Sequence, residues 1–269
     1  MKKSRFIIIV CLCCIVYSVF IYMEKKDNGT GASPMLDVPE SVLVASVKDN
    51  EKKLLKDVKA SDKEDGDITS KVFIESISEF DENKERLITY AVFDNDDHIT
   101  RATRKMKYKD YKAPKFDILI PLTTVYFGNE NYFLNHISAT SSVDGNITSK
   151  VSFTFNYEET KTSTIQYTVE DSCGVQSTIN LNVHDFPDTG TIDIELYEHL
   201  IYVPVGTNLT PSAYIKGVNY MGMESDEMIH DIKIHTDYDK TKKGTYEVIY
   251  DINGDGGEYG ATKMVVVVE

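Results

Sequence analysis

The sequence predicts an all-β protein of three tandem β-sandwiches that follow a single N-terminal transmembrane helix. One phrase occurs twice, about 80 residues apart, because residues 60–72 read ASDKEDGDITSKV and residues 139–151 read ATSSVDGNITSKV. Short segments with strictly alternating apolar residues recur between turn signals, as half-buried strands do. An uncharged apolar run near the start of the chain accounts for the helix.

The bulk composition limits the class of protein. The 269 residues suffice for two or three small domains, and an apolar fraction of 41% suffices for folded cores. The net charge of −14 argues against nucleic acid as a partner, because phosphate binding needs a basic face. Three of the four cysteines lie in the N-terminal apolar run, so we expect no disulfide framework around Cys173.

The apolar run 6–23 has the length of a membrane span. As a helix it covers roughly 27 Å at about 1.5 Å per residue, close to the hydrocarbon thickness of a bilayer. Residues 1–5 include Lys2, Lys3 and Arg5, and we expect them to form a basic tip in the cytoplasm. These features predict a signal-anchor in the cell membrane, single-pass, with the C-terminal modules extracellular.

A cleavable signal peptide is the alternative interpretation of this run. Signal peptides have a shorter apolar region that small residues follow closely. Here Glu24 and Lys25 follow the run directly, and the first small-residue site, Thr30-Gly31-Ala32, lies well downstream. The uncleaved anchor is therefore favoured, with residues 24–33 as a flexible tether to the first module.

Three modules follow the tether: module one at 34–112, module two at 113–185 and module three at 186–269. Each contains a late strand with a central tyrosine, namely Ile88-x-Tyr90-x-Val92, Ile165-x-Tyr167-x-Val169 and Val248-x-Tyr250-x-Ile252. This alternation places one face of the strand, tyrosine included, in a core. Pro114 and Pro187 stiffen the short linkers, so we expect a semi-rigid rod.

The repeated residues resemble bacterial surface immunoglobulin-like domains, which occur as repeats on exported proteins. The matching residues are Ala60, Asp62, Asp65–Thr69 and Val72 in module one, Ala139, Asp144, Gly145, Ile147, Thr148 and Val151 in module two, and Gly244–Tyr250 in module three. Module three lacks the Asp-Gly-Asp phrase. The resemblance covers nearly everything after residue 33 and implies three tandem immunoglobulin-like β-sandwiches on an exported protein.

Acidic loops of module one form the candidate metal site. In immunoglobulin-like topology the loops 62–67 and 94–97 lie at the same end of the sandwich. Calcium takes six to eight oxygens, which carboxylates and loop carbonyls can supply. The candidate calcium ligands are Asp62, Asp65, Asp67, Asp94 and Asp96. Ordinary turn chemistry is the alternative, since Asp and Gly favour tight turns and module two has Ser141 and Asn146 at corresponding places.

The sequence contains no recognisable catalytic constellation, so we expect that the protein is not an enzyme. The histidines, at positions 98, 136, 184, 199, 230 and 235, are scattered, and none has the spacing of a metal site. There is no G-x-S-x-G elbow and no phosphate loop. Cys173 lies in a predicted hairpin turn without an evident base nearby. Calcium is the one cofactor that the sequence raises.

Seventeen tyrosines raise a carbohydrate hypothesis, because aromatic faces stack on sugar rings. Core packing is the stronger interpretation for those in alternating strands. In module three, Tyr214, Tyr220 and Tyr259 are the candidates for exposed rings.

These observations favour a non-enzymatic, membrane-anchored bacterial surface protein whose modules mediate adhesion or protein–protein contact at the cell envelope. Besides the membrane, the expected partner is the cell wall, a surface protein, or a host protein or glycan. The candidate contact loops are Gly206–Asn208 and Asp237–Gly244 of module three. The alternative is a carbohydrate- or cell-wall-binding accessory protein that serves a separate enzyme.

Overall fold

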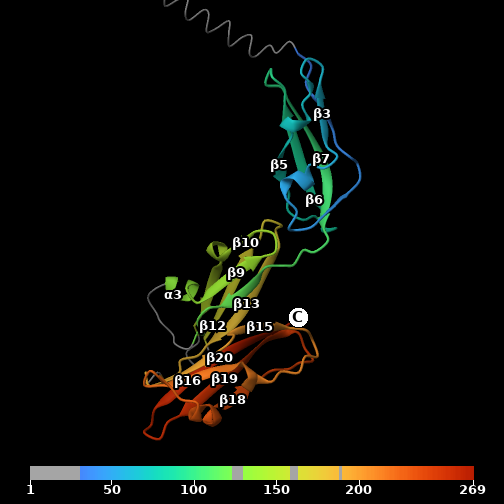
Figure 1. Ribbon diagram of the computed structural model, residues 1–269. Coiled ribbons are helices and arrows are strands. Elements are labelled where there is room, and N and C mark those ends of the chain that lie inside the picture. Colours follow the sequence, from blue (N-terminus) through green and yellow to red (C-terminus); the bar gives the residue numbers. More distant parts are fainter. Residues whose placement is uncertain (1–30, 123–129, 158–162, 188–189) are drawn as a thin grey trace, which may run out of the picture. The chain divides into compact units, whose positions relative to one another are not determined.

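The computed structural model describes residues 31–122, 130–157, 163–187 and 190–269, and these residues confirm the predicted all-β class (Figure 1). The chain forms two compact units, Met1–Tyr111 and Lys112–Glu269. Helices in the described residues are short. They are α2 (Glu51–Leu54), α3 (Glu130–Leu134) and the 3₁₀ turns η1 (Thr69–Lys71), η2 (Thr148–Lys150), η3 (Pro211–Tyr214) and η4 (Glu227–Asp231).

Two sheets enclose the core of the first unit. One has the strand order β1-β3-β4, and the other has the order β2-β7-β6-β5, with β2 parallel to β7. The strands are β1 (Met35–Asp37), β2 (Leu43–Ala45), β3 (Lys59–Asp62), β4 (Gly66–Asp67), β5 (Phe73–Ile77), β6 (Arg86–Phe93) and β7 (Ile99–Tyr108). Ala60 from the first sheet packs in one cluster with Ile88, Tyr90 and Val92 from the second, which makes the unit a β-sandwich.

Four sheets build the second unit. Module two contributes the orders β10-β9-β8 and β11-β12-β13, and module three contributes β14-β16-β17 and β15-β20-β19-β18. The strands of module two are β8 (Lys115–Ile118), β9 (Ile137–Ser141), β10 (Gly145–Asn146), β11 (Ser152–Asn156), β12 (Ser163–Glu170) and β13 (Gln176–Val183). Those of module three are β14 (Ile192–Leu196), β15 (Leu200–Val203), β16 (Ile215–Tyr220), β17 (Met223–Glu224), β18 (Lys233–Thr236), β19 (Gly244–Asn253) and β20 (Tyr259–Val268).

The repeated phrase folds in the same way in modules one and two. In both, a threonine hydroxyl accepts a hydrogen bond from an alanine N–H, at 3.0 Å for Thr69 with Ala60 and at 3.0 Å for Thr148 with Ala139. The glycine of each phrase has a left-handed backbone, with φ values of +75° and +72° that a side chain rarely adopts. The phrase therefore specifies a tight β-turn and a 3₁₀ turn, which is why it recurs.

The three predicted core tyrosines are fully buried, and each hydroxyl donates to a main-chain carbonyl oxygen earlier in its module. The oxygen atoms are 2.8 Å apart for Tyr90 with Leu54, 2.8 Å for Tyr167 with Phe133 and 2.9 Å for Tyr250 with Pro211. The aromatic ring fills the core, and the hydrogen bond satisfies the one polar atom that would otherwise be buried without a partner.

Strand β20 is buried on both faces. Met264, Val266 and Val268 belong to the core of module three, whereas Val265 belongs to the core cluster of module two, together with Leu200 of β15. In the described residues each sheet of module two has three strands, and residues of module three cover part of its buried cluster. The outer face of β15 and β20 supplies that cover, which joins both halves in one compact unit.

The division of the chain into two compact units is coarser than the three predicted modules, whose bounds stay predictions. The units separate between Tyr111 and Lys112, next to the first boundary. The second boundary, between residues 185 and 186, falls inside the second unit, where the two sandwiches share buried side chains.

The predicted single-pass localisation requires a correction. In the part of the chain that the structure describes, no helix combines the length and the apolar character that a bilayer crossing demands. That finding contradicts a single-pass membrane protein with extracellular modules. The apolar run 6–23, on which the prediction depended, lies outside the described residues.

Candidate functional site

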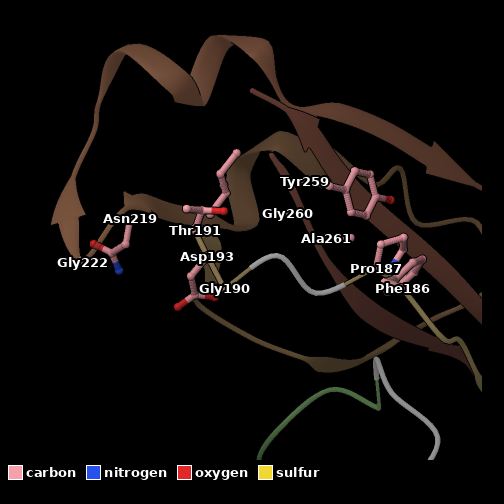
Figure 2. A pocket seen from close by; sticks show the side chains of 11 residues that line it. Phe186, Pro187, Gly190, Thr191, Asp193, Asn219, Gly222, Tyr259, Gly260 and Ala261 are labelled. Carbon is pink, nitrogen blue, oxygen red and sulfur yellow. The ribbon is translucent and has the colours of Figure 1, made fainter. Parts of the chain in front are cut away.

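A pocket of about 540 Å³ opens on module three (Figure 2). This volume lies in the range of small-ligand sites. Its wall consists of Phe186, Pro187, Gly190, Thr191, Ile192, Asp193, Asn219, Gly222, Tyr259, Gly260 and Ala261. The residues come from the segment before β14, the start of β14, the hairpin after β16 and the start of β20. Most of the surface that they present to the pocket is polar.

Glycines give the pocket its shape. A Cβ on Gly260 would lie 2.7 Å from both Cγ2 and the main-chain oxygen of Ile192, so only glycine allows β20 to approach β14 this closely. Another lining glycine, Gly222, forms the hairpin turn between β16 and β17 together with Met221, with φ values of +78° and +50°. A left-handed backbone is costly for methionine and normal for glycine, and this tight turn sets the register in which Asn219 pairs with Glu224 and Tyr220 with Met223.

One polar side chain of the pocket, Asn219, is held in place by a residue outside the pocket. Asn219 Nδ2 donates to Glu195 Oε1 at 2.7 Å, and Lys216 Nζ lies 2.7 Å from Glu195 Oε2. The hydrogen bond and charge of Lys216, with the bond from Asn219, lower the pKa of Glu195, which stays ionised. Asn219 is therefore oriented before any ligand arrives, which reduces the entropy that binding must overcome.

Two aromatic rings flank the polar groups. Tyr259 is half-buried, and burial with the nearby charge of Asp251 raises its pKa, so the phenol stays protonated. Phe186 stacks on His184 with ring centroids 5.2 Å apart and an interplanar angle of 9°. Figure 2 shows Tyr259 and Phe186 on one side of the pocket and Asp193 and Asn219 on the other. An aromatic wall opposite a carboxylate and a carboxamide suits binding of a polar, partly apolar molecule.

The acidic loops of module one are used as turn acceptors. Asp62 Oδ1 accepts the N–H groups of Glu64 and Asp65 at 2.8 and 2.9 Å, and these bonds, that of Asp65 foremost, lower the pKa of Asp62 against the opposing effect of burial. Asp65 Oδ2 accepts the N–H of Asn95 at 2.7 Å, which ties the two predicted loops together. Asp67 Oδ1 accepts the N–H of Thr69 at 2.9 Å.

The second acidic loop is built in the same manner. Asp94 Oδ1 accepts the N–H groups of Asp96 and His98 at 2.9 and 2.8 Å, and Oδ2 lies 2.7 Å from His98 Nδ1. Burial opposes the ionised form of Asp94, but these hydrogen bonds outweigh it and lower its pKa. The predicted proximity of the two loops is therefore correct, whereas the carboxylates mostly face main-chain N–H groups.

Module two makes the same turn without the same charges. Ser141 Oγ accepts the N–H groups of Val143 and Asp144 at 3.1 and 3.2 Å, and Asn146 Oδ1 accepts that of Thr148 at 2.9 Å. A hydroxyl and an amide thus replace Asp62 and Asp67, which supports turn chemistry as the role of the acidic residues. Nowhere in the described ranges do three or more His, Cys, Asp or Glu side chains form a group that could hold a metal ion. The calcium site at Asp62, Asp65, Asp67, Asp94 and Asp96 stays a prediction.

The loops expected to contact a partner meet at one end of module three. The N–H of Gly206 donates to the carbonyl oxygen of Lys240 at 2.7 Å, and Lys240 Nζ donates to Asn208 Oδ1 at 2.7 Å. Tyr238 Oη donates to the carbonyl oxygen of Thr207 at 2.7 Å. These contacts lie beside the first residues of β19 and the last of β20, whereas the pocket contains the first residues of β20. Module three therefore presents two separate surfaces.

A buried polar cluster joins modules two and three, and no local sequence pattern predicts it. Lys263 is 1% exposed, and its Nζ lies 2.8 Å from Glu247 Oε1 and also donates to the carbonyl oxygen of Asn182. Glu247 Oε2 accepts from Asn182 Nδ2 at 2.9 Å and lies 2.7 Å from His184 Nε2. Burial opposes ionisation of Glu247, but the bonds from His184, Lys263 and Asn182 lower its pKa to about 2.

The remaining candidates from the sequence have structural positions. Cys173 is buried in the turn after β12, where its N–H donates to Asp171 Oδ1 at 2.9 Å. Tyr214 and Tyr220 are half-buried rather than exposed, and Tyr220 Oη donates to Glu258 Oε1 at 3.4 Å. The only sequence signal for the pocket is the set of glycines at 190, 222 and 260. The sequence does not reveal which residues approach these glycines in the fold.

Comparisons with known proteins give no family for this chain. No protein-family model matches it, and no curated protein matches it. Among solved structures, ZmpB of Clostridium perfringens (the M60 catalytic domain with CBM51-1 and CBM51-2) aligns at 11% identity over 88% of this chain and 31% of that chain, with a TM-score of 0.24. The ZmpB fragment of CBM51-2 in complex with GlcNAc and INT domains aligns at 18% identity over 56% of this chain and 42% of that one, with a TM-score of 0.23. Human CDH23 EC21-23 aligns at 11% identity over 88% of this chain and all of that chain (100%), with a TM-score of 0.22. The chain thus spans less than half the length of either ZmpB structure.

Proposed function

We propose that this protein is a non-enzymatic binding and adhesion protein, and that the pocket on module three is its ligand site. The observation that carries the proposal is the pocket itself, which combines a ligand-sized volume with an Asn219 side chain that Glu195 holds in place. Recognition of this kind needs shape and oriented polar groups, and it needs no nucleophile or general base.

The part of the chain that the structure describes supports binding rather than catalysis. Glu247 and Lys263, whose pKa values are shifted from their ordinary values, are buried against each other and not open to a substrate. At the pocket, Asp193 is exposed and has no histidine, lysine or cysteine among the other lining residues. A carboxylate alone beside neutral groups can orient a ligand, but it lacks a partner for acid–base work.

We further propose that the three modules are copies of one immunoglobulin-like sandwich, related as the sequence resemblance implies. Support comes from the buried tyrosines at 90, 167 and 250, which make the same hydrogen bond in each module. The shared threonine bond in modules one and two is a second point of agreement.

Carbohydrate is the second candidate ligand, beside a protein surface. It is favoured by the Tyr259 ring opposite Asp193 and Asn219, because sugars present an apolar face for stacking and hydroxyl groups for polar bonds. A protein partner would instead be expected on the loops 206–208 and 237–244, which are tied together by hydrogen bonds.

Binding assays with two matched variants separate these possibilities. The pocket variant combines Asp193→Ala with Asn219→Ala, and the loop variant combines Asn208→Ala with Lys240→Ala. The purified full chain is applied to a glycan array and to purified peptidoglycan, and used as bait for envelope proteins. Loss of binding in the pocket variant alone supports the proposed site. Loss in the loop variant alone moves the site to the loops, and no binding by the unaltered chain in any assay refutes the proposal.

A further inference from the structure

On the outward face of the sheet β11-β12-β13, three rows of side chains run across all three strands. Every side chain in these rows is polar and uncharged. Phe153, Tyr167 and Ile179 of these strands lie in the core of module two, so alternate residues point outward. The first two rows across the strands are Ser152, Thr168 and Thr178, then Thr154, Gln166 and Asn180. No Asp, Glu, Lys or Arg lies in these rows, and Glu170, which pairs with Gln176 beyond the end of β11, borders them.

The third row continues the pattern and ends at module three. It consists of Asn156, Thr164 and Asn182. Asn182 is fixed by its bond to Glu247, 2.9 Å away in the buried cluster. The polar face, defined as these three rows, is therefore continuous with the junction inside the second unit.

This composition is unusual for the chain. Charged residues make up 27% of the sequence. The corresponding sheet of the first unit follows that composition, since Arg101 pairs with Glu75 at 2.7 Å and Lys105 pairs with Glu85 at 3.0 Å. We expect a strand face that only contacts solvent to carry charged side chains, as the sheet of the first unit does. Solubility alone therefore does not explain the uncharged polar face of module two.

The side chains of the face are partly held by one another. Gln166 Nε2 donates to Asn180 Oδ1 at 2.9 Å, and the hydroxyl oxygens of Thr168 and Thr178 lie 3.4 Å apart. Each amide and hydroxyl has further donor and acceptor capacity after these bonds. Neighbouring strands lie about 4.8 Å apart, and outward residues follow one another about every 6.8 Å along each strand. The hydrogen-bonding groups of the face are therefore spaced as a regular grid.

We propose that this polar face docks an extended, uncharged polysaccharide. Sugar hydroxyls donate and accept hydrogen bonds as the Ser, Thr, Asn and Gln side chains do, so a repeating neutral chain matches a repeating neutral grid. A polyanion would be repelled by the protein, whose net charge is −14. A protein partner would require an apolar centre, which the three rows lack. Single contacts to such a face are weak, and a polymer gains affinity by making many at once.

Affinity electrophoresis of the full chain tests this inference. Native gels contain hydroxyethylcellulose, galactomannan or dextran as neutral polymers, and carboxymethylcellulose as the charged counterpart of the first. At least one neutral polymer is expected to retard the protein, and carboxymethylcellulose is not. Two single variants, Thr154→Glu and Asn180→Asp, place a charge on exposed positions of the polar face away from the core. Each should raise the apparent Kd for the neutral polymer that retards the unaltered chain at least tenfold. Thr103→Glu, on the exposed face of the first unit, is the matched control and should change nothing.

Three outcomes would overturn the inference. The first is that no neutral polymer retards the protein. The second is that the variants of the polar face are retarded as strongly as the unaltered chain. If the pocket variant of Asp193 and Asn219 then loses retardation, the proposed function at the pocket is retained and the polar face is excluded as the polysaccharide site. The third is that sedimentation shows a dimer that Thr154→Glu dissociates, because the face would then be an interface between two copies of this chain.

Discussion

Lys263 Nζ lies 2.8 Å from Glu247 Oε1 in the interior of the second unit, where the lysine is 1% exposed. A buried ion pair is stable only when both partners are present and their remaining hydrogen-bonding groups are satisfied. Here Asn182 and His184 of module two complete the set. The pair lies in module three but its remaining partners lie in module two, so its loss should destabilise both modules.

Removal of the lysine should destabilise the second unit strongly. Lys263→Ala leaves Glu247 buried without its cation, and we expect the free energy of unfolding to fall by about 3–5 kcal/mol. The double variant Lys263→Met with Glu247→Leu removes both charges and should recover most of the loss. Urea unfolding of the three proteins measures this, and equal stability of Lys263→Ala and the unaltered chain would contradict the pairing.

The same cluster predicts an acid-sensitive unit. The folded-state pKa of Glu247 is about 2, below its ordinary value of 4.5. Its contribution is therefore complete above pH 4.5 and is lost as the pH falls from 4.5 towards 2, by about 3 kcal/mol in total. Glu247→Gln should be less stable than the unaltered chain at pH 7, and this difference should shrink across that window. A constant difference from pH 7 to pH 2 would mean that Glu247 is not ionised in the folded protein.

Packing across the two modules gives a third prediction. Val265→Ala removes apolar volume from the core of module two although the residue belongs to module three, and we expect a loss of about 1–3 kcal/mol. Hydrogen exchange should accelerate in β12 and β13. Val266→Ala is the control, because Val266 faces the core of module three and should accelerate exchange in β19 instead. Unchanged protection of β12 in Val265→Ala would show that module two folds independently of β20.

Several core positions can be predicted directly from the sequence, whereas the buried contact between modules two and three cannot. Tyr90, Tyr167 and Tyr250 were predicted as core because alternation is local, and all three are fully buried. In the sequence, the pattern Met264-x-Val266-x-Val268 predicts an alternating strand with one buried face. A continuous apolar run is typical of a strand buried on both faces, which is what β20 is.

Polar positions were harder to predict for a physical reason. Lys263 contacts Glu247 of the neighbouring strand β19 and Asn182, which is 81 residues away, and a charged residue in a strand is ordinarily exposed. The pocket likewise depends on the approach of Gly260 to Ile192, which no local pattern encodes. The acidic residues of module one stand out in the sequence by their charge, whereas the structure uses the Asp62 carboxylate as an acceptor for N–H groups two and three residues onward.

The turn chemistry of module one can be tested by copying module two. Asp62→Ser should keep both N–H bonds, as Ser141 does, and should leave the Tm nearly unchanged. Asp62→Ala removes the acceptor and should lower the Tm by a few degrees. Calcium titration of the same proteins by calorimetry tests the metal prediction, since binding by the unaltered chain that disappears in Asp62→Ser would support a calcium role for this carboxylate.

The glycine at the base of the pocket should not tolerate a methyl group. In Gly260→Ala the new Cβ would lie 2.7 Å from the Ile192 main-chain oxygen, closer than van der Waals contact allows, so β14 must move away from β20. We expect a loss of about 1–3 kcal/mol in unfolding free energy, together with weaker ligand binding at the pocket. Gly217→Ala in β16 is the matched control, because nothing lies within 4 Å of its Cβ position and its stability should be unchanged or higher. Equal unfolding curves for the two variants would show that the close contact between β14 and β20 does not shape this site.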